Sequence, residues 1–166
     1  IQKRAAFGVH PGLDRNQPDW FKLMSFTSDS PNMTRSEEGG LQKTFDWQDR
    51  IILVAEDEDA NYLYLKTAIS WTKATVIRAN NGSEAVEMVK ANPNIDLILM
   101  DIKMPVMNGI DATKAIKSIN SSMIVIAQTA YDNEDDRKIY LSAGCNDFLA
   151  KPITREKLLK TISRYF

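Results

Sequence analysis

The sequence predicts an α/β protein built on a doubly wound, five-stranded parallel sheet. Three observations lead to this fold class. Short apolar segments alternate with amphipathic segments five times within about 120 of the 166 residues, which the layer rules associate with a parallel sheet between helices. Each apolar segment is too short for a helix and is closed by polar residues. The common order for such a five-stranded sheet is 2-1-3-4-5, with its switch point between the first and third strands.

The first half of this domain contains two predicted strands, 51–55 and 75–79, both short and rich in β-branched residues. Between them, Tyr62, Leu65 and Ile69 recur at the spacing of one helical face. Asn80-Asn81-Gly82 is a turn, and Ser83 is the expected N-cap of the next helix, which runs to Ala91.

The third strand, 97–100, is apolar throughout and closed by Asp101, as expected for the buried centre of a parallel sheet. A loop with Pro105 and Gly109 follows. The next helix should bury Ala112, Ala115, Ile116 and Ile119, which lie at i, i+3, i+4 and i+7.

The last two strands are predicted at 123–127 and 147–150. The helix between them should begin near Asp132 or Asn133, with acidic residues in its first turn, and end near Gly144. Thr154 should cap the final helix.

Residues 1–46 differ from this pattern. Turn-forming clusters such as His10-Pro11-Gly12 recur, and an aromatic stretch, 20–26, lies between them. This density of turns predicts a linker or the tail of an upstream domain, with part of it ordered by packing, while 47–166 forms the folded domain.

Composition excludes several functions. The net charge of -1 argues against binding to nucleic acid or to an anionic membrane. The single cysteine, Cys145, excludes an internal disulfide framework and favours a reducing compartment. No apolar run approaches the roughly 18 residues of a membrane span, and no signal-peptide pattern is visible. We therefore expect a cytoplasmic domain without membrane contact.

Acidic residues follow the two strands that flank the switch point. Glu56 and Asp57 come after the first strand, and Asp101 closes the third. Converging carboxylates repel one another unless a cation is present, and hard oxygen ligands favour Mg²⁺ or Mn²⁺. No glycine-rich loop follows the first strand, so a nucleotide-binding domain is not expected.

The other two strand ends carry Thr129 and Lys151. A hydroxyl can donate to a phosphoryl oxygen, and a lysine supplies a positive charge. Taken alone, each of these residues is an ordinary polar residue at a strand end, and so is Asp101. The proline after Lys151 permits a cis bond, which the sequence does not decide.

Together, Glu56-Asp57, Asp101, Thr129 and Lys151-Pro152 resemble the receiver domain of response regulators in two-component (phosphorelay) signalling, over residues 50–166. The resemblance implies the flavodoxin-like receiver fold and phosphorylation of Asp101. It also implies Mg²⁺ held by Glu56, Asp57, Asp101 and the backbone carbonyl of Lys103. Thr129 and Lys151 would bind the phosphoryl group, and Phe148 would move inward when Thr129 shifts.

The resemblance also implies a protein partner, a histidine kinase or a histidine phosphotransfer protein. His10 lies among turn-forming residues and does not resemble a phosphodonor site. The pattern is similar to the C-terminal receiver of a hybrid sensor kinase, and a stand-alone receiver with an N-terminal arm is the alternative. Phosphorylation could drive homodimerisation through the last two helices. The domain itself would be a self-catalysing phosphoacceptor, not a stand-alone enzyme.

Two alternative functions stay open at this point. One is a Mg²⁺-dependent phosphatase with an aspartyl nucleophile, although Lys103 occupies the position of the second aspartate those enzymes often carry. The other is an interaction module that acts without phosphorylation. The sequence also departs from the common receiver pattern: the acidic pair is Glu-Asp, and Lys103 and Tyr131 flank the expected path of water, so we expect them to alter the lifetime of the phosphoryl group.

Overall fold

The computed structural model describes residues 45–130 and 134–166, so the predicted linker up to residue 44 and its aromatic stretch lie outside the described residues. Five parallel strands lie in the order β2-β1-β3-β4-β5. The predicted fold class and strand order are therefore confirmed. The strands are β1 (Ile51–Ala55), β2 (Thr75–Ala79), β3 (Leu97–Asp101), β4 (Ile124–Thr129) and β5 (Asp147–Ala150). The helices are α1 (Asp59–Ser70), α2 (Gly82–Ala91), α3 (Gly109–Ile119), α4 (Glu134–Ala143) and α5 (Arg155–Ile162).

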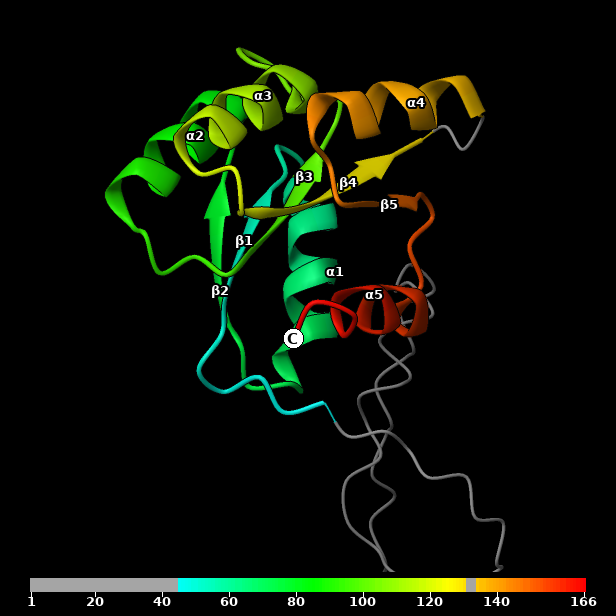
Figure 1. Cartoon of the computed structure of the whole chain (residues 1–166). Helices are drawn as coiled ribbons and strands as arrows, with labels where there is room; N and C mark the ends of the chain where they lie inside the picture. The colour runs from blue at the N-terminus through cyan, green and yellow to red at the C-terminus, as the bar shows by residue number, and fades with distance from the viewer. Residues whose placement is uncertain (1–44, 131–133) are drawn as a thin grey trace, which may run out of the picture. The chain divides into compact units, whose positions relative to one another are not determined.

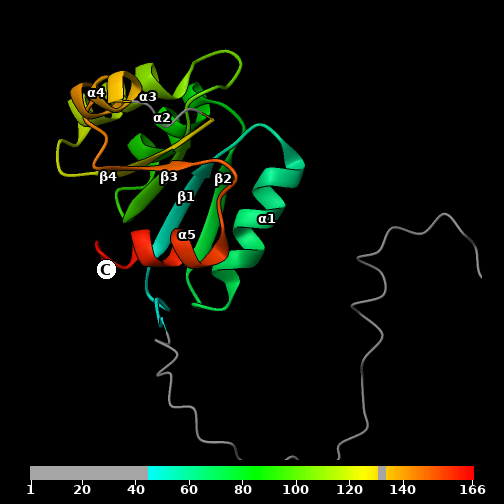
Figure 2. The same ribbon diagram turned by 90° about the vertical axis from the view of Figure 1, so that its right-hand side faces the viewer.

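The sheet separates two layers of helices. In Figures 1 and 2, α1 and α5 cover one face, and α2, α3 and α4 cover the other. Each face has its own buried apolar cluster, and β3 lies at the centre with all five residues buried. Apolar residues on both sides of a strand are what a sheet covered on both faces requires. The carboxyl ends of all five strands consequently meet at one edge.

Three local expectations need correction. The N-cap of α2 is Asn81, whose side chain accepts a hydrogen bond from the Glu84 backbone N–H, so the expectation of Ser83 was wrong. Ile119 is 47% exposed because the buried face of α3 is centred on Ala112 and Thr113, which leaves Ile119 at its edge in the last turn. β4 runs two residues further than expected.

The extra length of β4 matters for the site. Gln128 pairs with Asp101 of β3, and Thr129 pairs with Ala150 of β5. Thr129 is thus the last residue of β4, paired with β5 on one side, and not the first residue of a loop. The register of the sheet therefore sets the position of its backbone relative to Asp101.

The described residues that precede β1 contact the folded domain. Phe45 and Trp47 pack with ring centroids 5.3 Å apart, and Trp47 meets Phe166 edge to face at 5.2 Å. Among the described residues, no helix is long and apolar enough to cross a membrane.

Candidate functional site: a carboxylate cluster with a lysine

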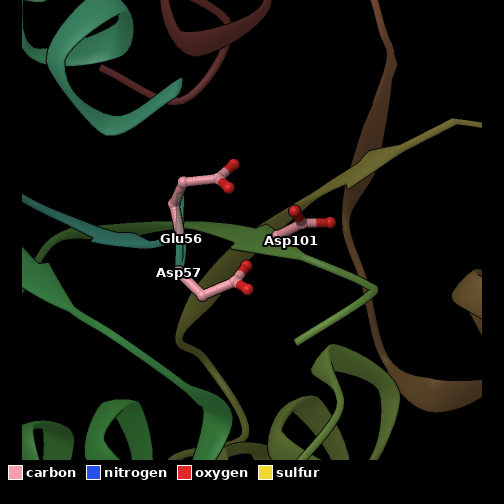
Figure 3. A group of neighbouring side chains, drawn as sticks. All are labelled: Glu56, Asp57 and Asp101. Atoms are coloured by element: carbon pink, nitrogen blue, oxygen red, sulfur yellow. The ribbon is translucent and has the colours of Figure 1, made fainter. Parts of the chain in front are cut away.

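Three carboxylates meet at the carboxyl edge of the sheet. Glu56 and Asp57 directly follow β1, Asp101 ends β3, and these strands are neighbours in the sheet. One oxygen from each carboxylate lies within 4.8 Å of the other two, and Figure 3 shows the cluster at the two strand ends. Glu56 and Asp101 are buried, whereas Asp57 is exposed. The sheet order therefore brings together the acids predicted to form the site.

The donor set fits a small hard cation. Magnesium prefers carboxylate oxygens about 2.0–2.1 Å away in an octahedron, where opposite ligands lie about 4.2 Å apart. Three oxygens within 4.8 Å of one another need only small side-chain movements to reach that geometry. Lys103, whose carbonyl was the fourth predicted ligand, lies beside this cluster, and its backbone N–H donates to Asp101 Oδ1 at 3.1 Å.

Lys151 reaches the cluster from β5. Its Nζ donates to Asp101 Oδ2 at 2.7 Å and to Glu56 Oε2 at 3.1 Å. Its backbone N–H is bound to the Thr129 carbonyl at 2.7 Å, and the Lys151–Pro152 bond is cis. Burial alone would lower the pKa of Lys151, but hydrogen bonds and charges from Asp101 and Glu56 outweigh it and raise the pKa.

In Glu56, burial has a larger effect on the pKa than the hydrogen bond from Lys151 has. Its burial raises the pKa of the carboxyl group, and the nearby charge of Asp101 raises it further. The hydrogen bond from Lys151 acts against both effects, and Asn61 Nδ2 also donates to Glu56 Oε1 at 3.3 Å. A cation should bind favourably beside Glu56, because its positive charge stabilises a carboxylate that is buried and is repelled by Asp101.

Arg78 holds the acidic loop, and the sequence analysis did not identify it. Its guanidinium donates to two consecutive carbonyls, Glu56 O at 3.1 Å and Asp57 O at 3.0 Å, and pairs with Asp59 at 2.6 Å. It also lies 4.7 Å from the ring centroid of Tyr62. The available signal was an arginine inside a short apolar strand, where a charge needs buried partners.

Gly109 keeps the loop after β3 close to Asp101. Its N–H donates to the Ile102 carbonyl at 3.0 Å, and a Cβ at this position would collide with the backbone carbonyl of Asp101. Only glycine permits so close an approach between the start of α3 and the end of β3. The glycine that the sequence placed after the acidic strand end therefore has a steric reason.

The α4 side of the site is built from other contacts. Thr129 is buried, and its Oγ1 lies 2.8 Å from the hydroxyl of Tyr140, which is also buried. Phe148 is half-buried, and the guanidinium of Arg137 lies 4.4 Å from its ring centroid. The sequence analysis identified Thr129 and Phe148 but neither of their α4 partners. Tyr131 lies outside the described residues.

A cavity of about 480 Å³ opens over these groups. Its walls include Asp57, Asp101, Lys103, Thr129, Tyr140 and Lys151. Acids, hydroxyls and the lysine therefore share one crevice at the switch point of the sheet, where ligands bind in open α/β sheets.

Comparison with known proteins agrees with this geometry. The profile of the family described as "Response regulator receiver domain" matches residues 52–163. The chain belongs to the response regulator receiver family. The receiver family profile covers β1 to the end of α5, the part of the chain that forms the sheet and carries the carboxylate cluster.

Two curated relatives are proteins of two-component signalling. "Two-component response regulator 24" of Arabidopsis thaliana is 43% identical over 84 residues, which are 51% of this chain and 60% of that protein. "Two-component system protein A" of Emericella nidulans is 35% identical over 117 residues, 69% of this chain and 17% of that protein. The chain thus spans 60% of the first relative and a sixth of the second.

Two solved structures share the fold. One is the receiver domain of a Saccharomyces cerevisiae response regulator, solved with a histidine phosphotransfer signalling protein; the match has a TM-score of 0.67 and 31% identity, over 70% of this chain and 88% of that one. The other is the CheX–CheY complex with BeF3 and magnesium from Borrelia burgdorferi, with a TM-score of 0.67 and 30% identity over 69% and 87% of the two chains.

Proposed function

We propose that Asp101 accepts a phosphoryl group from a phosphohistidine on a partner protein, in the presence of Mg²⁺ or Mn²⁺. The observation that carries this proposal is the contact of Lys151 Nζ with Asp101 Oδ2 beside two further carboxylates. A lysine also neutralises part of the charge of a carboxylate cluster, so the contact supports the proposal in combination with the cation site. Metal ions and lysines are the groups that stabilise the charge of a transferring phosphoryl group.

Each residue of the site has a separate role in the proposed reaction. A carboxylate oxygen of Asp101 bonds to phosphorus while the P–N bond to the donor histidine breaks. The electron pair of the P–N bond goes to the imidazole nitrogen. Glu56, Asp57, Asp101 and the Lys103 carbonyl hold the cation, which neutralises charge on the phosphoryl oxygens. Lys151 and the Thr129 hydroxyl donate to those oxygens. Catalysis of this kind consists of positioning and electrostatic stabilisation.

The product, an aspartyl phosphate, places about two negative charges at a strand end where the carboxylate carried one. We propose that Thr129 then moves toward the phosphoryl group and that Phe148 turns into the space it leaves. Thr129 ends β4, and Phe148 lies in the neighbouring strand β5, where it pairs with Ala127 and is only half-buried. A charge that biases one of two packing arrangements is a common design for a switch.

The partner class follows from the chemistry. A phosphohistidine donor belongs to a histidine kinase or a histidine phosphotransfer protein, and the yeast relative was solved with a protein of the latter kind. We propose a cytoplasmic setting, which the lone cysteine supports. Membership of a hybrid kinase and phosphorylation-dependent dimerisation through α4 and α5 stay predictions.

The test is incubation with Mg²⁺ and acetyl phosphate. We expect an acid-stable, hydroxylamine-labile adduct on Asp101 that is lost in Asp101→Asn and when the cation is chelated. The matched control is Asp111→Asn, which removes an exposed carboxylate on α3 and should leave adduct formation unchanged.

Two outcomes would contradict the proposal. Hydrolysis of unrelated phosphoesters would point to a phosphatase with an aspartyl nucleophile. No adduct with acetyl phosphate or with a phosphorylated histidine phosphotransfer protein would point to a module that acts without phosphorylation.

A further inference from the structure

Helix α4 contacts both residues of the proposed switch. Tyr140 meets Thr129 through a hydroxyl–hydroxyl contact of 2.8 Å, and Arg137 covers the Phe148 ring at 4.4 Å. Arg137 and Tyr140 are three residues apart, so they lie on the same side of the helix, one turn from each other. A single helix face thus contacts both β4 and β5 at the switch.

The Thr129–Tyr140 contact is closed to solvent. Thr129 is 2% exposed and Tyr140 is 4% exposed. Among the described residues, the Tyr140 hydroxyl forms its hydrogen bond with Thr129 Oγ1. A phenylalanine would fill the same apolar space, so the hydroxyl is present for the bond and not for packing.

The two uses of the Thr129 hydroxyl compete. Either hydroxyl can be the donor in the contact of Thr129 with Tyr140, so the competition is one of position. In the proposed switch Thr129 moves toward Asp101 to donate to a phosphoryl oxygen, and this movement lengthens its contact with Tyr140. The Tyr140 hydroxyl must then find another partner, and leaving it buried without one is costly.

We propose that Tyr140 is a positioning residue that holds the Thr129 hydroxyl away from the phosphoryl site until Asp101 is phosphorylated. Its release then loosens α4, and the contact of Arg137 with Phe148 is broken in the same step. This inference rests on the proposed phosphorylation of Asp101. It adds that the packing of α4 opposes phosphorylation and changes when phosphorylation occurs. Both effects follow because the position of Thr129 and the packing of α4 belong to one equilibrium.

The primary test is Tyr140→Phe, which keeps the ring and removes the bond. We expect acetyl phosphate to phosphorylate this variant about fivefold faster than the wild type, equal to about 1 kcal/mol, because the resting position of Thr129 loses its support. Tyr165→Phe is the matched control. It removes a hydroxyl that donates to the Asn146 carbonyl, away from the crevice, and should leave the rate unchanged.

A double-mutant cycle distinguishes positioning from a general effect on stability. Thr129→Val slows phosphorylation, and in that background Tyr140→Phe should add nothing, because the hydroxyl through which it acts is gone. A rate increase of the same size with and without Thr129 would overturn the inference.

Hydrogen exchange supplies a second readout. In the wild type, α4 amides should exchange faster once Asp101 is phosphorylated, and in Tyr140→Phe they should already exchange fast without phosphorylation. If Tyr140→Phe is too unstable to measure, Arg137→Ala tests the other α4 contact and should also accelerate phosphorylation.

The outcomes separate the two proposals. An adduct on Asp101 that forms at the wild-type rate in both α4 variants would overturn the role of α4 and leave the phosphoacceptor function intact. Absence of an adduct in every protein, the wild type included, would overturn the function and this inference with it.

Discussion

The two walls of the crevice around Asp101 are held together by different interactions. The wall formed by the ends of β1 and β5 is charged: Lys151 joins Asp101 to Glu56, and Arg78 grips two carbonyls of the acidic loop. The wall formed by β4 and α4 depends on a neutral hydroxyl pair, Thr129 and Tyr140. Buried residues lie at the centre of both walls: Glu56 and Asp101 form ion pairs with Lys151 in the first, and the uncharged Thr129 and Tyr140 meet in the second.

This difference matches the role that we propose for each wall. Charge-assisted hydrogen bonds contribute about 1.5–3 kcal/mol, whereas neutral ones contribute about 0.5–1.5 kcal/mol. In the proposed reaction, strong contacts would keep the acids and the lysine in place before the phosphoryl group arrives, so that electrostatic catalysis avoids reorganisation. Weak contacts would let Thr129 and α4 change position at a smaller cost in free energy. The charged wall therefore suits the proposed chemistry, and the neutral wall suits the proposed switch.

The largest expected effect comes from breaking the charged wall at Lys151. Lys151→Met should slow phosphorylation of Asp101 by acetyl phosphate by about 10²–10³-fold, because the phosphoryl oxygens lose a fixed positive charge. Rates of adduct formation measure this. Lys90→Met, which removes an exposed lysine paired with Glu87, is the control. A loss below tenfold would mean that the lysine is not part of the chemistry.

A smaller effect is expected at Arg78. Arg78→Met should weaken Mg²⁺ binding about tenfold, because the acidic loop loses two hydrogen bonds to its backbone. Calorimetric titration of the metal checks this. Arg50→Met removes another arginine–aspartate pair, which lies at the amino ends of β1 and β3, opposite to the ends that carry the cluster, and should not change the affinity. Equal affinities in all three proteins would show that the loop holds its shape without Arg78.

A substitution of Glu56 measures how much the buried carboxylate lowers the stability of the protein in the absence of metal. Its pKa is raised in the folded protein, chiefly by burial, so protonation favours folding. That stability is fully present below the unfolded value of 4.5 and is lost as the pH rises through the higher folded pKa. Glu56→Gln should therefore be more stable than the wild type at neutral pH, by about 0.5–2 kcal/mol.

Denaturant unfolding in a chelator, from pH 4 to pH 7, measures this difference. The stability gap between Glu56→Gln and the wild type should open as the pH rises. Glu87→Gln, at an exposed carboxylate on α2, should follow the wild type at every pH. A gap independent of pH would show that ionisation of Glu56 does not limit stability.

The smallest effect is expected at the mouth of the crevice. Lys103 is exposed there, and Tyr131 follows β4 two residues after Thr129. Exchanging Lys103 for Asn and Tyr131 for Glu should change the dephosphorylation rate by about threefold, because the resemblance to receivers predicts that these two positions flank the path of water. Decay of the adduct in the presence of Mg²⁺ measures it. An unchanged lifetime would exclude a role for this pair.

The sequence by itself determined the elements and the acidic edge. Buried strands such as 97–100 read as apolar runs because the helices of a parallel sheet cover both faces, and that pattern is local. Once the order 2-1-3-4-5 is assigned, the carboxyl ends carrying Glu56, Asp101 and Lys151 must share one edge. The resemblance to receivers then supplied the roles of residues that are ordinary when taken singly.

Only the tertiary structure decided which residues hold the site in place. Arg78, Arg137 and Tyr140 act on partners far along the chain or in another element, and nothing in their immediate sequence reveals those partners. The exposure of Ile119 and the N-cap at Asn81 likewise depend on how α3 and α2 pack and begin. Local patterns specify what a segment becomes, but hydrogen bonds between segments depend on distances that only the packed fold sets.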